Sequence, residues 1–207
     1  MMDNIVITIA RQYGSGGRTI GKQLAKTLGV SFYDREILRI ASDISGINEQ
    51  LFAQADERLK NTPIFSIQKT VYDGSLLPPD SDDYTSTRNL FNFQAKVIKG
   101  LAKTESCVIV GRCADFILKD FDNAMSVFIY ADDAFNFERA MERNSMSEAE
   151  MRKFIAKRNK YRGDYYKYYT GKEWWDARNY DLCLNSAKLG FEKCEEAILS
   201  YRKVRFS

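Results

Sequence analysis

The chain has 207 residues, no histidine and a formal net charge of +3. The missing imidazole excludes Ser-His-Asp and Cys-His hydrolases, HExxH metalloproteases and histidine-ligated zinc or iron sites. Hydrophobic residues make up 44% and charged residues 29%, which is ordinary for a folded globule, and the length fits one domain over residues 1–207. Because the net charge is small, nucleic acid is not the expected partner.

The N-terminal segment predicts a strand, a glycine loop and a helix. Ile5–Ile9 is a continuous β-branched run, typical of a strand buried on both faces of a parallel sheet. Gly14–Gly17 follows, and then Ile20 and Leu24 lie one turn apart on a helix that Gly29 ends. This order is the opening of a βαβ unit.

The middle of the chain predicts a short strand over 30–33, a helix over 35–42 and a second helix over 87–103. Between these helices, residues 61–86 hold all three prolines (Pro63, Pro78 and Pro79) and an acidic run. We expect an irregular, mobile insertion there.

The C-terminal half predicts strands over 107–110, 125–130 and 181–185. One helix, opened by Asp132, is expected to hold Arg139 and Arg143, and a second begins at the capping box Ser147–Glu150. A last helix ends near Arg205. Alternating strands and helices predict a parallel α/β sheet with helices on both faces.

Glycine, arginine and aspartate recur where the predicted strands end. Gly14–Thr19 follows the first strand, Asp34 the second, and Gly111-Arg112 the strand over 107–110, with Asp115 one turn later. Each feature alone would suit a routine turn. Because the carboxyl ends of parallel strands share one sheet edge, their combination predicts a ligand site there.

The loop after the first strand is similar to the phosphate-binding pattern GxxxxGK[ST]. In one register Gly17 is the second glycine, Arg18 stands at the lysine position, Thr19 at the hydroxyl position and Gln12 at the first glycine. In the other, Gly16 is the second glycine, Gly17 replaces the lysine and Arg11 the first glycine. We prefer the first register because it keeps a cation and the hydroxyl, and we expect anion binding at this helix N-terminus.

Cations and aromatic rings interleave over Lys157–Trp175. This pattern has three interpretations: a solvated amphipathic helix whose tyrosines pack on the core, a nucleic-acid surface, and a mobile lid that brings arginines onto a transferred phosphoryl group.

The four cysteines, Cys107, Cys113, Cys183 and Cys194, show no CxxC spacing, so we expect buried, reduced thiols. The first residues are too short an apolar stretch for a membrane span and lack the pattern of a signal peptide. The expected location is the cytoplasm, with no membrane association.

The order of these pieces resembles the cytidylate kinase-like branch of the nucleoside monophosphate kinases. The segments that carry the resemblance are ITIARQYGSGGRTIG, FYDREIL, VIVGRCADFIL, KRNKYRGDYYKYYTG and WWDARNYDLCLNS, which span nearly the whole chain. It implies a P-loop kinase fold: a three-layer α/β/α arrangement with a mostly parallel central sheet, an acceptor-binding insertion over 61–103 and a helical lid over 145–175.

The resemblance also implies residue roles. The residues implied to bind ATP phosphates are Gly14, Ser15, Gly16, Gly17, Arg18 and Thr19, with Thr19 holding Mg²⁺. Those implied for the monophosphate acceptor are Asp34, Arg39, Arg112 and Asp115. Arg18, Arg158 and Arg162 would act on the transferred group, the last two from the lid.

The chain departs from the family pattern at two places: the P-loop lysine is missing in both registers, and Val110 stands where an aspartate precedes Gly-Arg. The resemblance implies ATP-dependent phosphoryl transfer to CMP, dCMP or a related small acceptor. A nucleotide-binding sensor with weak or no catalysis, and a kinase of a non-nucleotide small molecule, stay as alternatives. Whether the chain forms a homodimer is left open.

Overall fold

The structure, a computed structural model, describes residues 4–61 and 72–207. The expected insertion over 61–86 therefore lies partly outside the described residues, Pro63 included. Residues 72–86 form turns and irregular chain up to the next helix, as predicted.

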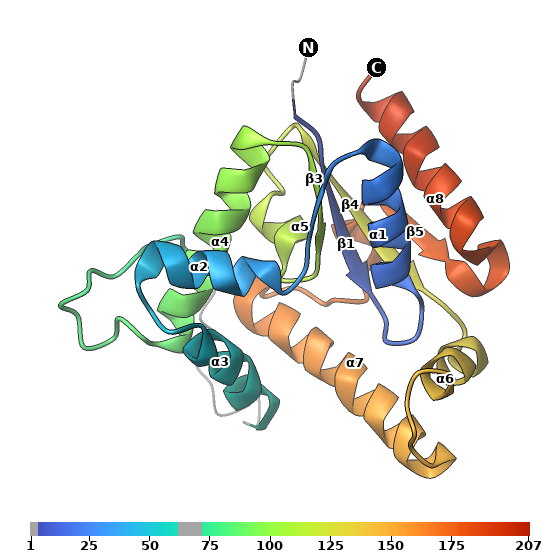
Figure 1. Cartoon of the computed structure of the whole chain (residues 1–207), viewed down its shortest axis with the longest axis horizontal. Coiled ribbons are helices and arrows are strands. Elements are labelled where there is room, and N and C mark those ends of the chain that lie inside the picture. Colours follow the sequence, from blue (N-terminus) through green and yellow to red (C-terminus); the bar gives the residue numbers. More distant parts are fainter. Residues whose placement is uncertain (1–3, 62–71) are drawn as a thin grey trace.

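The centre of the molecule is a five-stranded sheet in the order β2-β3-β1-β4-β5, with every neighbouring pair parallel (Figure 1). The strands are β1 (Val6–Arg11), β2 (Ser31–Tyr33), β3 (Cys107–Val110), β4 (Ala124–Tyr130) and β5 (Leu182–Asn185). The predicted parallel α/β sheet is confirmed, and each predicted strand is present within a residue or two of its expected ends.

The helices are α1 (Gly17–Leu28), α2 (Glu36–Ser45), α3 (Glu49–Asn61), α4 (Thr87–Thr104), α5 (Ala114–Ile117), α6 (Asp133–Met141), α7 (Glu148–Thr170) and α8 (Ser186–Arg205), with a 3₁₀ turn, η2, at Ala177–Asn179. The Gly29 stop and the Ser147 to Glu150 capping box are confirmed. One prediction was wrong: Arg143 lies beyond the end of α6, because the helix stops at Met141 and the chain turns. The helices α3 and α5 were not predicted.

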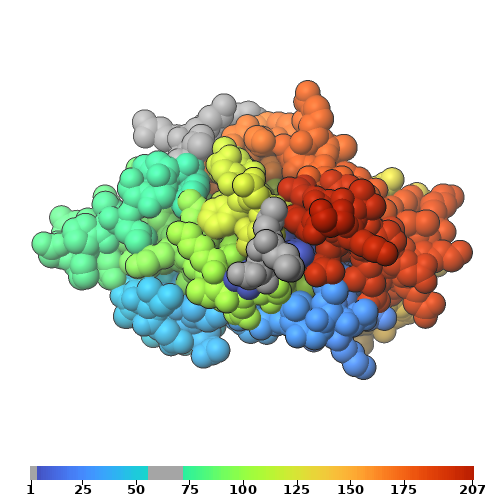
Figure 2. Space-filling view, turned by 90° about the horizontal axis from the view of Figure 1, so that it is seen from above, coloured from blue at the N-terminus to red at the C-terminus, as the bar shows by residue number. Residues whose placement is uncertain are grey.

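Helices cover both faces of the sheet, as the strand pattern predicted. On one face, Ile20 and Leu24 of α1 and Ile198 of α8 pack against Ile7 and Ile9 of β1. Helices α2, α4 and α5 and the C-terminal part of α7 cover the other face. Figure 2 shows α8 (red) beside α1 (blue), which agrees with the packing of these two helices.

The glycine loop lies where the chain changes direction across the sheet. From β1 the chain passes to β2 and β3 on one side and then to β4 and β5 on the other, so β1 lies between β3 and β4. Such a switch point at the carboxyl ends of parallel strands is the usual ligand position of this architecture.

Three cysteines are buried and Cys183 is partly buried, all as free thiols, which confirms the expectation from their spacing. Across the described ranges, no helix combines the length and the apolar character that crossing a membrane requires.

Candidate functional site

The loop between β1 and α1 presents the N-terminus of a helix to the sheet edge. Gly14 has φ +91° and Gly16, the N-cap of α1, has φ +78°, values that favour glycine. The first turn of α1 holds no acidic side chain and the N-cap has no side-chain partner. Its backbone N–H groups and the helix dipole are therefore available to an anion.

The glycines are also required by crowding. A Cβ on Gly14 would lie 2.4 Å from the carbonyl oxygen of Asn136, and one on Gly16 would lie 2.2 Å from the ring of Phe191. The loop is thus pressed against α6 and α8 on its outer side, which fixes the direction in which its amides point.

Polar side chains also bind the loop to the end of β4 and to α6 through hydrogen bonds. Gln12, which stands at the first-glycine position of the preferred register, accepts hydrogen bonds through Oε1 from the Ala131 amide at 2.9 Å and from Asn136 Nδ2 at 3.1 Å. The buried Ser15 hydroxyl lies 3.0 Å from the Ile129 carbonyl, to which it donates. Gln12 therefore ties the loop to β4 and α6.

We predict that Gly14→Ala destabilises the fold by about 2–4 kcal/mol, because left-handed strain adds to a clash with backbone. Gly29→Ala is the matched control, since Gly29 has φ +66° but nothing within 4 Å of its would-be Cβ. It should lose only about 1–2 kcal/mol. Urea unfolding of both variants measures the difference, and equal losses would contradict the crowding of the loop.

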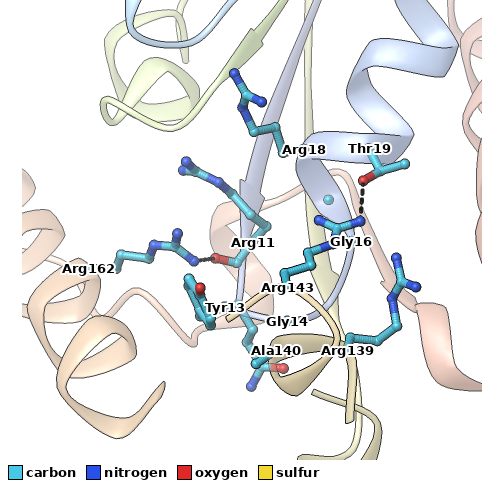
Figure 3. A pocket seen from close by; sticks show the side chains of 12 residues that line it. Arg11, Tyr13, Gly14, Gly16, Arg18, Thr19, Arg139, Ala140, Arg143 and Arg162 are labelled. Carbon is cyan, nitrogen blue, oxygen red and sulfur yellow. Dashed lines mark hydrogen bonds between the residues drawn. The ribbon is translucent and has the colours of Figure 1, made fainter. Parts of the chain in front are cut away.

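A cavity of about 150 Å³ opens beside the loop. Its wall combines the loop with side chains from α6, the turn after it, and α7 (Figure 3). The lining residues are Arg11, Gln12, Tyr13, Gly14, Gly16, Gly17, Arg18, Thr19, Arg139, Ala140, Arg143 and Arg162. Five of them are arginines, and none is acidic.

Three of these arginines come from outside the loop. Arg143 donates from Nη2 to the Thr19 hydroxyl at 3.5 Å, so its guanidinium lies over the start of α1 (Figure 3). Arg162 of α7 donates to the carbonyl of Arg11 at 2.8 Å. The buried Nε of Arg139 has no hydrogen-bond partner among the described residues.

The arginines at this site lie close enough together to lower one another's pKa values. Burial lowers the pKa of Arg11 to about 10; Asp34 acts against this shift, while Arg112 and Arg18 add to it. Burial also lowers the pKa of Arg162 well below its usual value, and Arg11 and Arg158 lower it further. Guanidiniums packed this close repel one another, so a polyanion that lies among them is stabilised.

The structure brings Arg18 and Asp34 together. Nε of Arg18 donates to Asp34 Oδ2 at 2.6 Å, and the guanidinium lies 5.9 Å from the centre of the Phe32 ring. Asp34 also faces Arg11, at 3.8 Å. Arg39 is exposed, lies 3.5 Å from Asp43 and does not line the cavity.

The other predicted site residues, two from the acceptor side and one from the lid, do not line the cavity. Arg112, which follows β3 with φ +61°, is close enough to lower the pKa of Arg11. Asp115 of α5 accepts a hydrogen bond from the Tyr166 hydroxyl at 2.7 Å. Arg158 of α7 lies 5.0 Å from the centre of the Phe154 ring.

Asp115 makes stability depend on pH. Burial raises its pKa to about 6, and the hydrogen bond from Tyr166 acts in the opposite direction. Since an unfolded aspartate titrates near pH 4, the unfolded chain alone releases this proton between about pH 4 and 6. The folded state therefore loses stability as pH rises through this window, by at most about 3 kcal/mol.

We predict that Asp115→Asn removes this loss, because asparagine is uncharged and its carbonyl can still accept from Tyr166. In urea titrations from pH 4 to about 7, the stability of Asp115→Asn relative to wild type should rise with pH. A difference that stays constant over this range would contradict the raised pKa of Asp115.

The segment 157–175 has the core-packed tyrosines of the first interpretation, and one of its arginines lines the cavity. In the C-terminal half of α7, Tyr165, Tyr166 and Tyr169 are buried and pack into the core. One turn or more earlier, Asn159 accepts from the Tyr13 amide at 2.8 Å and Arg162 lines the cavity. The tyrosines thus anchor a helix whose other half reaches the loop.

Thr19 is the predicted magnesium ligand, but its hydroxyl accepts from Arg143 in a cavity lined by five arginines and no acidic residue, so the ion would depend on phosphate oxygens for its negative ligands. Thr19 lines the cavity at the first turn of α1, and the described residues hold no cluster of three or more metal-ligating side chains. Mg²⁺ usually takes one or two protein ligands and completes its shell with water and phosphate oxygens. A single hydroxyl beside a phosphate site fits this requirement.

Arg11, Arg139 and Arg143 are cavity residues that the sequence-based prediction of the site did not include. The two α6-side arginines reach the loop because β1 pairs with β4, a long-range contact that no local pattern reports. The sequence could have indicated Arg11, because in the second register it occupies the first-glycine position of the phosphate-binding pattern.

The fold is that of the P-loop kinases, and an arginine-lined cavity lies beside its glycine loop. The chain belongs to the cytidylate kinase-like family, whose model matches residues 6–188. No curated relative was found.

Solved structures share the fold of this chain. The chain is similar to the crystal structure of an uncharacterized protein from Eubacterium ventriosum, at 28% identity and a TM-score of 0.71, over 97% of this chain and 99% of that one. Shikimate kinase from Bacteroides thetaiotaomicron matches at 13% identity and a TM-score of 0.53, over 96% and 98% of the two chains. The latter supports the fold alone.

Proposed function

We propose that the protein is an ATP-dependent phosphotransferase that transfers the γ-phosphoryl group to CMP, dCMP or a related small acceptor. The observation that carries this proposal is the arginine-lined cavity at the N-terminus of α1. Membership of the cytidylate kinase-like family supports the nucleotide and the reaction class.

The chain's residues have distinct tasks in this proposal. Amides of Gly14–Thr19 bind the phosphates of ATP, and Arg143 adds a cation above them. Arg112 binds the acceptor phosphate at the end of β3, within the acceptor-binding region that also includes residues 61–103. Asp34 holds the neighbouring arginines in place.

Phosphoryl transfer between phosphate groups needs alignment and charge neutralisation more than acid-base chemistry, which suits a chain without histidine. Thr19 would be the protein ligand of Mg²⁺, which would supply neutralisation of the phosphate charge. Residues 145–175 act as the lid. From this lid, Arg162 and Arg158 neutralise charge on the transferred group.

Shikimate kinase shares this fold and is named after a small non-nucleotide substrate, which keeps a second acceptor class in the proposal. Val110 stands where the family pattern has an acidic side chain, and Asp34, directly after the adjacent strand β2, supplies a carboxylate at this edge. The acceptor is therefore best identified by assay.

The test is ADP formation from ATP and Mg²⁺ against a panel of nucleoside monophosphates and small hydroxyl acceptors, with calorimetric ATP binding in parallel. Turnover with CMP or dCMP supports the proposal, and turnover with a hydroxyl compound alone changes the acceptor class. Tight ATP binding without turnover on any acceptor would indicate a sensor, and absence of ATP binding contradicts the proposal.

A further inference from the structure

The side chain of Arg11 leaves the end of β1 and runs between two glycines of different loops. A Cβ on Gly17 would lie 2.6 Å from Cβ of Arg11, and a Cβ on Gly111 would lie 2.3 Å from its Nη1. Neither position has room for a side chain while Arg11 stays where it is. The two glycines thus form a channel that directs the Arg11 guanidinium from the glycine loop toward the end of β3.

Arg11 is less well neutralised than Arg18. Both face Asp34, but Arg18 lies 2.6 Å from this carboxylate and Arg11 lies 3.8 Å from it. The Arg11 side chain is 19% exposed and that of Arg18 is 52% exposed. Because its charge is shielded less by water, Arg11 gains more from an added anion than Arg18 does.

The second register of the loop relates the contact between Arg11 and Gly17 to the phosphate-binding pattern. In that register the first glycine of the phosphate-binding pattern is Arg11, the lysine is Gly17 and the hydroxyl position is Arg18, so Thr19 stays the candidate metal ligand through its place in the cavity and not through this register. The two residue types have exchanged places. The side chain of Arg11 begins beside the Cα from which the missing lysine would extend.

We propose that Arg11 replaces the P-loop lysine as the cation that binds phosphoryl oxygens at this site, and that Arg18 instead serves as the ion-pair partner of Asp34. This inference rests on the proposed function for the identity of the ligand. The Arg11 guanidinium would bind two phosphoryl oxygens with its planar fork, where a lysine offers a single point charge.

The test compares Arg11→Gln with Arg18→Gln and with Arg178→Gln, a charge-matched control paired with Asp176 outside the cavity. Titration with inorganic tripolyphosphate and with Mg-ATP should show a loss of about 10- to 100-fold in affinity for Arg11→Gln. The loss for Arg18→Gln should be smaller, and Arg178→Gln should bind as wild type does. A larger loss for Arg18→Gln than for Arg11→Gln would overturn the inference.

Arg11 is largely buried in the fold, with a side chain 19% exposed, so a transposition variant guards against a trivial loss through misfolding. In the double variant Arg11→Gly with Gly17→Lys, the cation returns to the helix and the clash with the Arg11 side chain is removed, which leaves Ile129 Cβ, at 3.3 Å, as the remaining close contact of the new Cβ. Circular dichroism checks the fold of each variant. The inference predicts that the double variant binds tripolyphosphate at least about 10-fold more tightly than Arg11→Gly alone, and equal affinities in folded proteins would contradict it.

The two proposals fail in different ways. Wild-type protein that binds tripolyphosphate through Arg11 but turns over no acceptor contradicts the kinase and leaves Arg11 as the phosphate-binding cation. If wild type and the Arg11→Gln variant turn over an acceptor at the same rate, the role of Arg11 is contradicted and the kinase proposal stands.

Discussion

Replacing Arg162 by glutamine is expected to lower the turnover number about 1,000-fold while Mg-ATP affinity changes less than about 10-fold. Arg162 reaches the cavity from α7, donating to the Arg11 carbonyl at 2.8 Å. Its guanidinium lies 5.8 Å from the centre of the Tyr13 ring.

The size of this effect follows from how the charge of Arg162 is held. Burial and the nearby Arg11 and Arg158 lower its pKa, so the cation is poorly stabilised until negative charge develops beside it. A preorganised cation of this kind contributes most in the transition state. The loss should therefore fall mainly on the turnover number, with a smaller effect on the binding of ATP, whose phosphates the same guanidiniums stabilise.

Arg158→Gln is the comparison for this prediction. Arg158 lies on the same helix, but its guanidinium packs on the Phe154 ring and it does not line the cavity. Its loss of turnover should be smaller than that of Arg162→Gln. Steady-state kinetics on the best acceptor of the panel measure both, and an Arg162→Gln enzyme with more than about a tenth of wild-type turnover would contradict the assignment.

Thr19→Val is expected to lower turnover at saturating ATP by about 100-fold or more and to raise the Mg²⁺ concentration required for half-maximal rate. Valine keeps the shape of threonine and removes the hydroxyl. In the structure this hydroxyl lines the cavity and accepts from Arg143, so its loss removes the candidate metal ligand without a change in volume.

Thr19→Ser is the control, because serine keeps the hydroxyl and should retain most of the activity. Magnesium titrations of the reaction rate separate a metal ligand from a packing residue. If Thr19→Val and wild type show the same dependence on Mg²⁺, Thr19 does not bind the metal.

Local sequence patterns were sufficient for the elements that hold the loop. The β-branched run of β1, the glycines that require positive φ and the Gly29 stop are all encoded within a few residues, and the structure contains each of them. Helix α3 was missed because its buried side chains, Phe52 and Ala55 among those described, are sparse within a polar stretch.

The cavity depends on contacts that local patterns do not contain. Arg139 and Arg143 lie more than 120 residues after the loop and reach it because β4 pairs with β1. The direction of Arg18 toward Asp34 likewise depends on where β2 lies in the sheet. The residue types at the site were therefore foreseeable, whereas the choice among several arginines required the fold.

The central claim is that the loop and its arginines bind a nucleoside triphosphate. The most direct measurement is the change in backbone amide resonances on titration with Mg-ATP, followed by NMR on isotope-labelled protein. We expect the resonances of the amides of residues 14–19 and of the Arg11, Arg143 and Arg162 Nε–H groups to shift together and to saturate. The backbone amide resonances of the C-terminal half of α8 should not shift. Saturating shifts confined to another part of the molecule, or none at all, would contradict the account.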